Sequence, residues 1–145
     1  MCQYKNKFHI AEEDLVVYKI LKGRNGKLYS FFLGFEYEVG KTYFDRHKIK
    51  DEEVTDNPPS AIDRDFYHAF LNREAAEWYL QDLKENQLCF KSHTLNSSLA
   101  LVKCTVPAGT KYFLGEVPSF NNVYIPTVAA KKIKINKIVD YVPNR

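Results

Sequence analysis

Residues 66–113 read FYHAFLNREAAEWYLQDLKENQLCFKSHTLNSSLALVKCTVPAGTKYF and decide the fold. A strand pattern at residues 66–70 leads into a helical pattern over residues 73–86, and a polar loop and further strand patterns follow. Within the helix, four apolar side chains recur at i, i+3, i+4 and i+7 and so share one face: Ala76, Tyr79, Leu80 and Leu83. A helix with one apolar stripe, flanked by strands, is expected to pack across a sheet.

Both ends of the predicted helix carry the signals expected of helix termini. Asn72 is in the N-cap position, where its side-chain oxygen can accept a hydrogen bond from a free amide of the first turn. Glu74 places negative charge near the positive end of the helix dipole, and Asn86 tolerates the left-handed conformation that often ends helices. The polar residues between them are expected to lie mostly on the solvent face: Arg73, Glu77, Gln81, Asp82 and Lys84.

The rest of the chain is rich in strand patterns. Residues 15–21, LVVYKIL, are apolar and β-branched enough for a central strand. Asn25-Gly26 predicts a tight hairpin turn, with a return strand over residues 28–33. Other strand patterns lie at residues 35–39, 41–44, 88–90, 99–106, 110–114, 123–126 and 131–139.

These patterns predict an α+β fold, a largely antiparallel, twisted sheet of about seven or eight strands with one main helix packed on it. A chain of 145 residues is the usual size of one domain, and we expect residues 1–145 to form a single domain. Residues 1–14 are expected to be peripheral, and residues 141–145 to be a tail. Residues 45–65 carry many charges and Pro58-Pro59, which predicts a long charged loop that is either a lid or an insertion.

Composition limits the compartment and the partners. The net charge is +3, from 21 Lys and Arg against 18 Asp and Glu, which does not indicate a nucleic-acid partner. No apolar run is long enough to span a membrane, and the N-terminus lacks a signal-peptide pattern. Three cysteines without a CxxC pair are typical of a reducing compartment: Cys2, Cys89 and Cys104. We therefore predict a cytoplasmic protein without a membrane partner, and leave open a protein or a nucleotide as its ligand.

No motif assigns a particular chemistry to particular residues. The four histidines lack zinc-ligand spacing, and phosphate-binding glycine loops and GxSxG are absent. We therefore predict no catalytic residue, no metal and no cofactor. His68 is of interest by position, because it precedes the helix N-terminus, where backbone amides and the dipole favour anions. A strand histidine that is hydrogen-bonded within the fold is the simpler interpretation.

Residues 131–139 alternate lysine with isoleucine, which predicts a strand with one basic face that carries Lys132 and Lys134 and leaves the place of Lys137 open. Lysines in such a row can contact phosphates. More often, lysines along a strand protect an exposed sheet edge from pairing with other chains. The mild net charge favours edge protection.

Three pieces of the sequence resemble a group of uncharacterised small domains from phages, prophages and gut bacteria. They are VYK at residues 17–19, YEVGKTY at residues 37–43 and YHAF at residues 67–70, which a helix follows. In that group a YEVGKTY strand leads to a GFHAF or GFHAC element, and here Phe66-Tyr67 replaces Gly-Phe. The resemblance implies no activity.

A second resemblance is to ADP-ribosyltransferase-like folds. It rests on the order of a Tyr-containing first strand, a strand that leads into an Ala-containing helix, LVKCTVPAGTK at residues 101–111, and a final strand. The resemblance implies NAD held by an Arg or His on the first strand and a Ser or Tyr on the next motif, with a catalytic Glu late in the chain. This sequence has Tyr18-Lys19, Asn72 and YIPT at residues 124–127 in those places, so a degenerate site is expected.

Two functions follow from these patterns. The first is a non-catalytic binding or interaction module of a phage, a mobile element or a gut bacterium, and the second is a nucleotide-handling enzyme with a degenerate ADP-ribosyltransferase-like fold. The residues favour the first. Both hypotheses place a ligand near the same six residues: Tyr18, Lys19, Tyr43, His68, Phe70 and Asn72.

Overall fold

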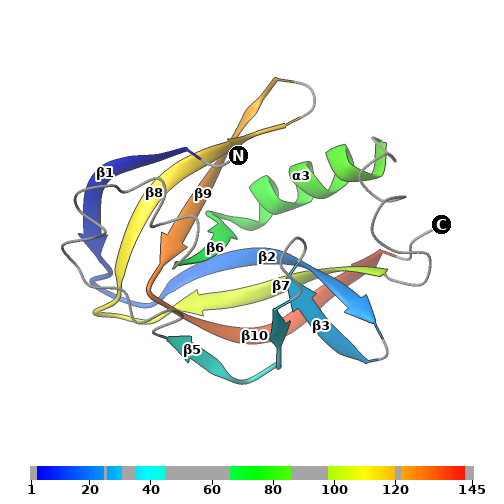
Figure 1. The fold of residues 1–145 in the computed structure, drawn as a ribbon, viewed down its shortest axis with the longest axis horizontal. Helices are drawn as coiled ribbons and strands as arrows, with labels where there is room; N and C mark the ends of the chain where they lie inside the picture. The colour runs from blue at the N-terminus through cyan, green and yellow to red at the C-terminus, as the bar shows by residue number, and fades with distance from the viewer. Residues whose placement is uncertain are drawn as a thin grey trace.

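The computed structural model describes residues 3–24, 26–30, 35–44, 66–85, 98–119 and 122–142. These residues form ten strands and one helix (Figure 1): β1 (Gln3–Ile10), β2 (Leu15–Arg24), β3 (Lys27–Ser30), β4 (Glu36–Tyr37), β5 (Thr42–Phe44), β6 (Tyr67–Phe70), α3 (Arg73–Glu85), β7 (Ser98–Val106), β8 (Lys111–Pro118), β9 (Tyr124–Ala130) and β10 (Lys132–Val142). All strand pairs are antiparallel. The predicted α+β class, with an antiparallel sheet and one main helix, is confirmed.

The sheet consists of two halves that meet at β2 and β6. The strand order is β1-β8-β9-β6-β2-β7-β10-β5; off this path, β3 pairs with β2, and β4 pairs with β3. Among the described residues, β6 and β2 pair only through Phe70 and Tyr18, whereas β2 and β7 pair along almost their whole length. Figure 1 shows β8 and β9 at a steep angle to β2, β7 and β10. We call β1, β8, β9 and β6 the first half-sheet, the other strands the second, and the β2–β6 line the seam.

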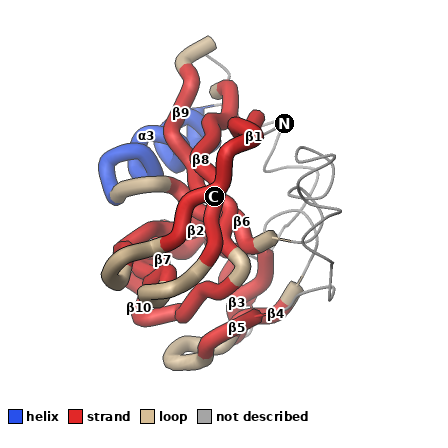
Figure 2. The backbone as a smooth tube through the Cα atoms, turned by 90° about the vertical axis from the view of Figure 1, so that its left-hand side faces the viewer, coloured by secondary structure: helices blue, strands red, loops and turns tan. Residues whose placement is uncertain are grey.

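Helix α3 lies against one face of the sheet, which we call the helix face (Figure 2). Its predicted apolar stripe is confirmed, since Ala76, Leu80 and Leu83 are buried against residues of β2 and β7. The helix also contacts the first half-sheet, where Ala75 packs with Val117 and Ile125. The helix therefore holds the two half-sheets together from one side.

The larger core lies on the opposite face of the sheet. Side chains of β2, β6, β7, β9 and β10 alternate between the two faces, and those on this face form one continuous cluster: Val17, Leu21, Tyr67, Ala69, Ala100, Val102, Cys104, Val106, Val128, Ala130, Ile133 and Ile135. Tyr37 joins this cluster, and Phe35 and Tyr43 pack against it. A strand with period-two alternation places neighbouring residues on opposite faces, so this core and the helix-face core share the same strands.

The structure corrects several expected boundaries. Residues 1–14 contain an edge strand, β1, which pairs with β8, and β9 extends to Ala130 although only residues 123–126 were expected to pair. Strand β10 continues to Val142, two residues into the predicted tail. Asp82 is buried at 2% exposure, so its predicted place on the solvent face is wrong. The predicted loop at residues 45–65 and the short strand at residues 88–90 lie outside the described residues.

The turn between β7 and β8 has the chemistry that the sequence predicts. Pro107 begins it, and the Thr110 amide donates a 3.1 Å hydrogen bond to the Pro107 carbonyl. Gly109 has φ 86°, a left-handed value that glycine adopts without a steric penalty. Asp14 Oδ1 accepts a 2.9 Å hydrogen bond from the Ala108 amide and so ties this turn to the start of β2.

Candidate functional site

The six predicted site residues divide between the two faces of the sheet. Tyr18 and Phe70 lie opposite each other at the seam and pack with the helix-face core. His68, two residues before Phe70 on β6, shares that face and is partly buried. Tyr43 packs against the opposite core. The structure therefore brings together Tyr18, Phe70 and His68, and separates Tyr43 from them.

Lys19 is a buried cation on the opposite face. Its residue exposure is 8%, and its ammonium donates a hydrogen bond to the backbone carbonyl of His68 across the seam. The same Nζ lies 5.2 Å from the centre of the Tyr37 ring, a cation–π contact. The rings of Tyr37 and Tyr43 are 5.1 Å apart. Lys19 thus joins β2 to β6 where the two strands make little backbone pairing.

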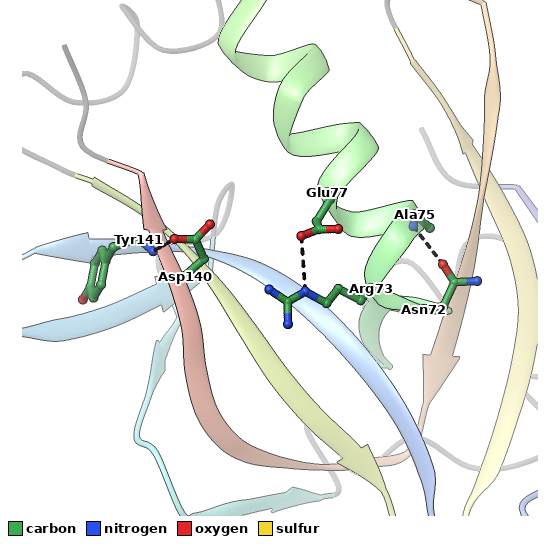
Figure 3. Close-up of polar contacts among 6 residues, drawn as sticks. All are labelled: Asn72, Arg73, Ala75, Glu77, Asp140 and Tyr141. Atoms are coloured by element: carbon green, nitrogen blue, oxygen red, sulfur yellow. Dashed lines mark hydrogen bonds and ion pairs between the residues drawn. The ribbon is translucent and has the colours of Figure 1, made fainter.

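Asn72 acts as the helix N-cap, as the sequence predicts. Its Oδ1 accepts a 2.8 Å hydrogen bond from the Ala75 amide, and its carbonyl accepts one of 3.2 Å from the Ala76 amide. Figure 3 shows the Asn72 side chain turned back onto the first turn of α3, with the Arg73–Glu77 ion pair one turn along. The Asn72 side-chain oxygen is therefore engaged by the fold.

Replacing Asn72 with alanine is expected to lower the free energy of unfolding by about 1 kcal/mol, because the Ala75 amide loses its acceptor. Asn72→Asp keeps an acceptor at the same place and should unfold near the wild-type midpoint. Urea denaturation followed by circular dichroism measures both. Equal destabilisation by alanine and aspartate would show that the cap is not the role of this side chain.

Cys104 is a free, fully buried thiol on β7. Burial raises the pKa of the Cys104 thiol from 9.0 to about 12, although the nearby Lys19 charge acts in the opposite direction. A thiol with this pKa stays protonated at neutral pH and is a poor nucleophile.

No group of His, Cys, Asp and Glu among the described residues is placed to hold a metal ion. In the same described part of the chain, no helix is long and apolar enough to cross a membrane.

Stability is expected to fall with rising pH because of Cys104. The unfolded thiol ionises near pH 9 and the folded thiol near pH 12, so between these values the native state binds more protons than the unfolded state. The free energy of unfolding should then drop by up to about 1.4 kcal/mol per pH unit from this group. Urea midpoints measured from pH 7 to 11 should fall more steeply for wild type than for Cys104→Ala. Parallel slopes would contradict a protonated native thiol.

A second surface lies on the helix face where α3 does not cover it. Lys103 on β7 and three lysines of β10 point from the second half-sheet, and we call these residues the lysine face: Lys103, Lys132, Lys134 and Lys137. In β10, Lys132 and Lys134 alternate with Ile133 and Ile135, which are buried in the opposite core. The bulge after Ile135 then brings Lys137 opposite Lys103.

The lysine face concentrates four positive charges on two neighbouring strands. Lys132, Lys134 and Lys137 are exposed and Lys103 is half-buried. In the described part of the chain, none of the four side-chain ammonium groups makes a hydrogen bond or an ion pair. Directly opposite residues of an antiparallel pair have Cβ atoms about 4.5–5.5 Å apart, so the Lys103 and Lys137 charges repel each other.

Two exposed apolar residues border the lysine face. Phe44 of β5 is 60% exposed and lies directly opposite Lys132. Val16 of β2 is 43% exposed, and it lies in one cross-strand row with Thr105 and Lys134. The Thr105 hydroxyl donates a 2.7 Å hydrogen bond to Asn136 Oδ1, which fixes the bulge next to Lys137.

Edge protection, the favoured interpretation of the β10 lysines, does not describe Lys132 and Lys134. Strand β5 pairs with both, so they lie inside the sheet and not on its edge. Sequence reasoning missed Lys103, Val16 and Phe44 as their neighbours. Lys103 and Val16 each stand next to a buried residue in a strand pattern, which assigns them to a solvated face. Only the register of β5, β10, β7 and β2 places these two residues and Phe44 beside the β10 lysines. A comparison of the chain with protein-family models, curated proteins and solved structures gives no match.

Proposed function

We propose that the protein is a non-catalytic interaction module that binds a negatively charged partner through the lysine face. The observation that carries this proposal is the pairing of Lys103 with Lys137 on neighbouring strands, beside Lys134, without a carboxylate partner among the described residues. Like charges directly opposite in a sheet cost about 0.2–1 kcal/mol. An anionic partner would offset this repulsion, so the paired lysines favour binding of a negatively charged partner.

The roles of the predicted site residues also favour binding over catalysis. Lys19 is buried and bonded to the His68 carbonyl, the Asn72 oxygen caps α3, and Phe70 packs under the helix. These contacts use the side chains to hold the two half-sheets and the helix together. The resemblance to small phage and gut-bacterial domains fits an accessory protein of a mobile element.

Charge reversal of the lysine face tests this proposal. Lys134→Glu/Lys137→Glu and the control Lys7→Glu/Lys84→Glu change the net charge equally, because all four side chains are exposed lysines. Lys7 is on β1 and Lys84 is at the end of α3, away from the lysine face. On an immobilised polyanion such as heparin, the lysine-face variant should elute at much lower salt than wild type, with a smaller shift for the control. Equal shifts in the two variants would refute the proposal.

A nucleotide-handling protein with an ADP-ribosyltransferase-like fold is the second candidate. The observation that favours it is the placement of Tyr18, Lys19, His68 and Phe70 along the seam between two half-sheets. The strand that leads into the helix, the Tyr-containing strand and the strand of residues 101–106 are also neighbours, in the order β6-β2-β7. This is compatible with the chain order on which that resemblance rests.

Thermal-shift measurements with NAD, mononucleotides and cyclic dinucleotides test the second candidate. A ligand that binds only the folded protein stabilises it by about 2.7 kcal/mol at a hundred times its Kd. A shift that disappears in Tyr18→Ala, but not in Lys134→Glu/Lys137→Glu, would place a nucleotide at the seam. Unchanged midpoints with every nucleotide would exclude the nucleotide-handling function at the concentrations used.

A further inference from the structure

We infer that the partner of the lysine face is a short acidic protein segment that also carries apolar side chains. This inference rests on the proposed function and names the partner of the same surface. It follows from three properties of the surface: its length, its side-chain types, which are lysines with one exposed aromatic ring and no arginine on the described strands β5, β7 and β10, and its apolar borders. Each property is a feature of the described strands and is argued separately.

The length of the lysine face suits a few residues of an extended chain. Lys132, Lys134 and Lys137 follow one strand, and the bulge at Asn136 lets the row cover four strand steps, so it spans about 13 Å at about 3.3 Å per residue. Same-face side chains of an extended peptide repeat about every 6.6 Å, as do Lys132 and Lys134. A segment of about five residues is long enough to place carboxylates over the row.

The side-chain types favour carboxylates over a nucleic-acid strand. Surfaces for single-stranded nucleic acid combine basic residues with several aromatic rings on which successive bases stack. Phe44 is the one well-exposed aromatic residue that the described strands place beside the lysines, because the half-buried Tyr18 packs with the helix-face core. The described arginines, Arg24 and Arg73, lie at the far end of β2 and in the first turn of α3. Neither of the two described arginines is therefore on the strands of the lysine face, where it could make a bidentate phosphate contact.

The borders of the lysine face fit apolar side chains of a peptide. Phe44 lies directly across from Lys132, and Val16 lies in the row that contains Lys134, so apolar and basic side chains alternate across the strands. Their exposures of 60% and 43% leave apolar surface that a peptide side chain can bury. The helix beside this face carries exposed glutamates, Glu74, Glu77 and Glu85. These carboxylates limit how far a long polyanion can extend over α3.

Fluorescence anisotropy with three labelled probes of equal charge tests the inference, at about 0.15 M salt, where unspecific surface attraction is screened. The probes are a peptide of about eight residues that alternates Glu and Leu, long enough to cover the row, a peptide of glutamates separated by serines, and an oligothymidylate. The proteins are wild type, Lys134→Glu/Lys137→Glu, the control Lys7→Glu/Lys84→Glu, and Val16→Ser/Phe44→Ser.

The Glu–Leu peptide is expected to bind wild type and the control alike, and to bind Lys134→Glu/Lys137→Glu about tenfold more weakly or worse, since two attractive contacts become repulsive. Val16→Ser/Phe44→Ser should lose the preference for the Glu–Leu peptide over the Glu–Ser peptide. Tighter, lysine-dependent binding of the oligothymidylate would overturn the acidic-segment inference and leave the proposed function standing. If Lys134→Glu/Lys137→Glu changed the binding of none of the three probes, both the acidic-segment inference and the proposed function would be overturned.

Discussion

Replacing Lys19 with glutamate is expected to lower the free energy of unfolding by about 4 kcal/mol or more, because the change buries a carboxylate against the His68 carbonyl in place of an ammonium. The Tyr37 ring face, which attracts the ammonium, would repel the carboxylate. Urea unfolding, monitored by the fluorescence of the single tryptophan, Trp78, measures the change.

Lys19→Met is the matched control for this prediction. Methionine keeps the length of the side chain and removes the charge, so the loss is limited to the missing donor at the His68 carbonyl and should be about 1–3 kcal/mol. The expected order of stability is wild type, then Lys19→Met, then Lys19→Glu. If Lys19→Glu matched wild type in stability, Lys19 would be a solvated residue and free to serve as a ligand contact.

The helix and the fold class could be predicted from the sequence because their signals are local. Asn72 and the apolar stripe at Ala76, Leu80 and Leu83 are within one segment, and the structure bears out both. The extent of β9 could not be predicted, because its pairing depends on β6 and β8, which lie far away in the chain or across a turn. Pro126 also lies within β9, and because proline is disfavoured inside a central strand, the predicted strand ended at this residue.

The six predicted site residues do not share one face of the sheet, for a geometric reason. Tyr18 and Lys19 are neighbours in sequence, but consecutive residues of a strand point to opposite faces. One therefore contributes to the helix-face core and the other to the aromatic cluster on the opposite face. Tyr43 lies on the same face as Lys19. Tyr18 and Lys19 are therefore neighbours in the sequence but do not contribute side chains to the same site.

The lysine face shows why residues that are far apart in the sequence could not be assigned to one surface. Period two alone places Lys132 and Lys134 on one face, but their neighbours come from β7, β5 and β2, and long-range register decides which residues meet. The bulge at Asn136 adds one residue to β10 and brings Lys137, an odd-numbered residue, onto the face of Lys132 and Lys134. A pattern read without the bulge would place Lys137 on the buried face.

Phe70→Ala is expected to lower the free energy of unfolding by about 3 kcal/mol, within the usual range for a largely buried aromatic residue. The Phe70 ring packs in both helix-face clusters, and its centre lies 5.1 Å from the centre of the Tyr79 ring. It therefore contacts the helix, the first half-sheet and β2, the strand of Tyr18, at once. Its removal would leave a cavity at the seam. Chemical denaturation measures the loss.

Phe44→Ala is the control that separates structure from binding. Phe44 is 60% exposed, so its truncation should change the free energy of unfolding by about 0.5 kcal/mol or less. The same change should weaken binding of the Glu–Leu peptide, whereas Phe70→Ala, measured where it is still folded, should bind that peptide as wild type does. The opposite pattern, a stable Phe70→Ala that fails to bind and a Phe44→Ala that binds normally, would move the binding surface from the lysine face to the seam.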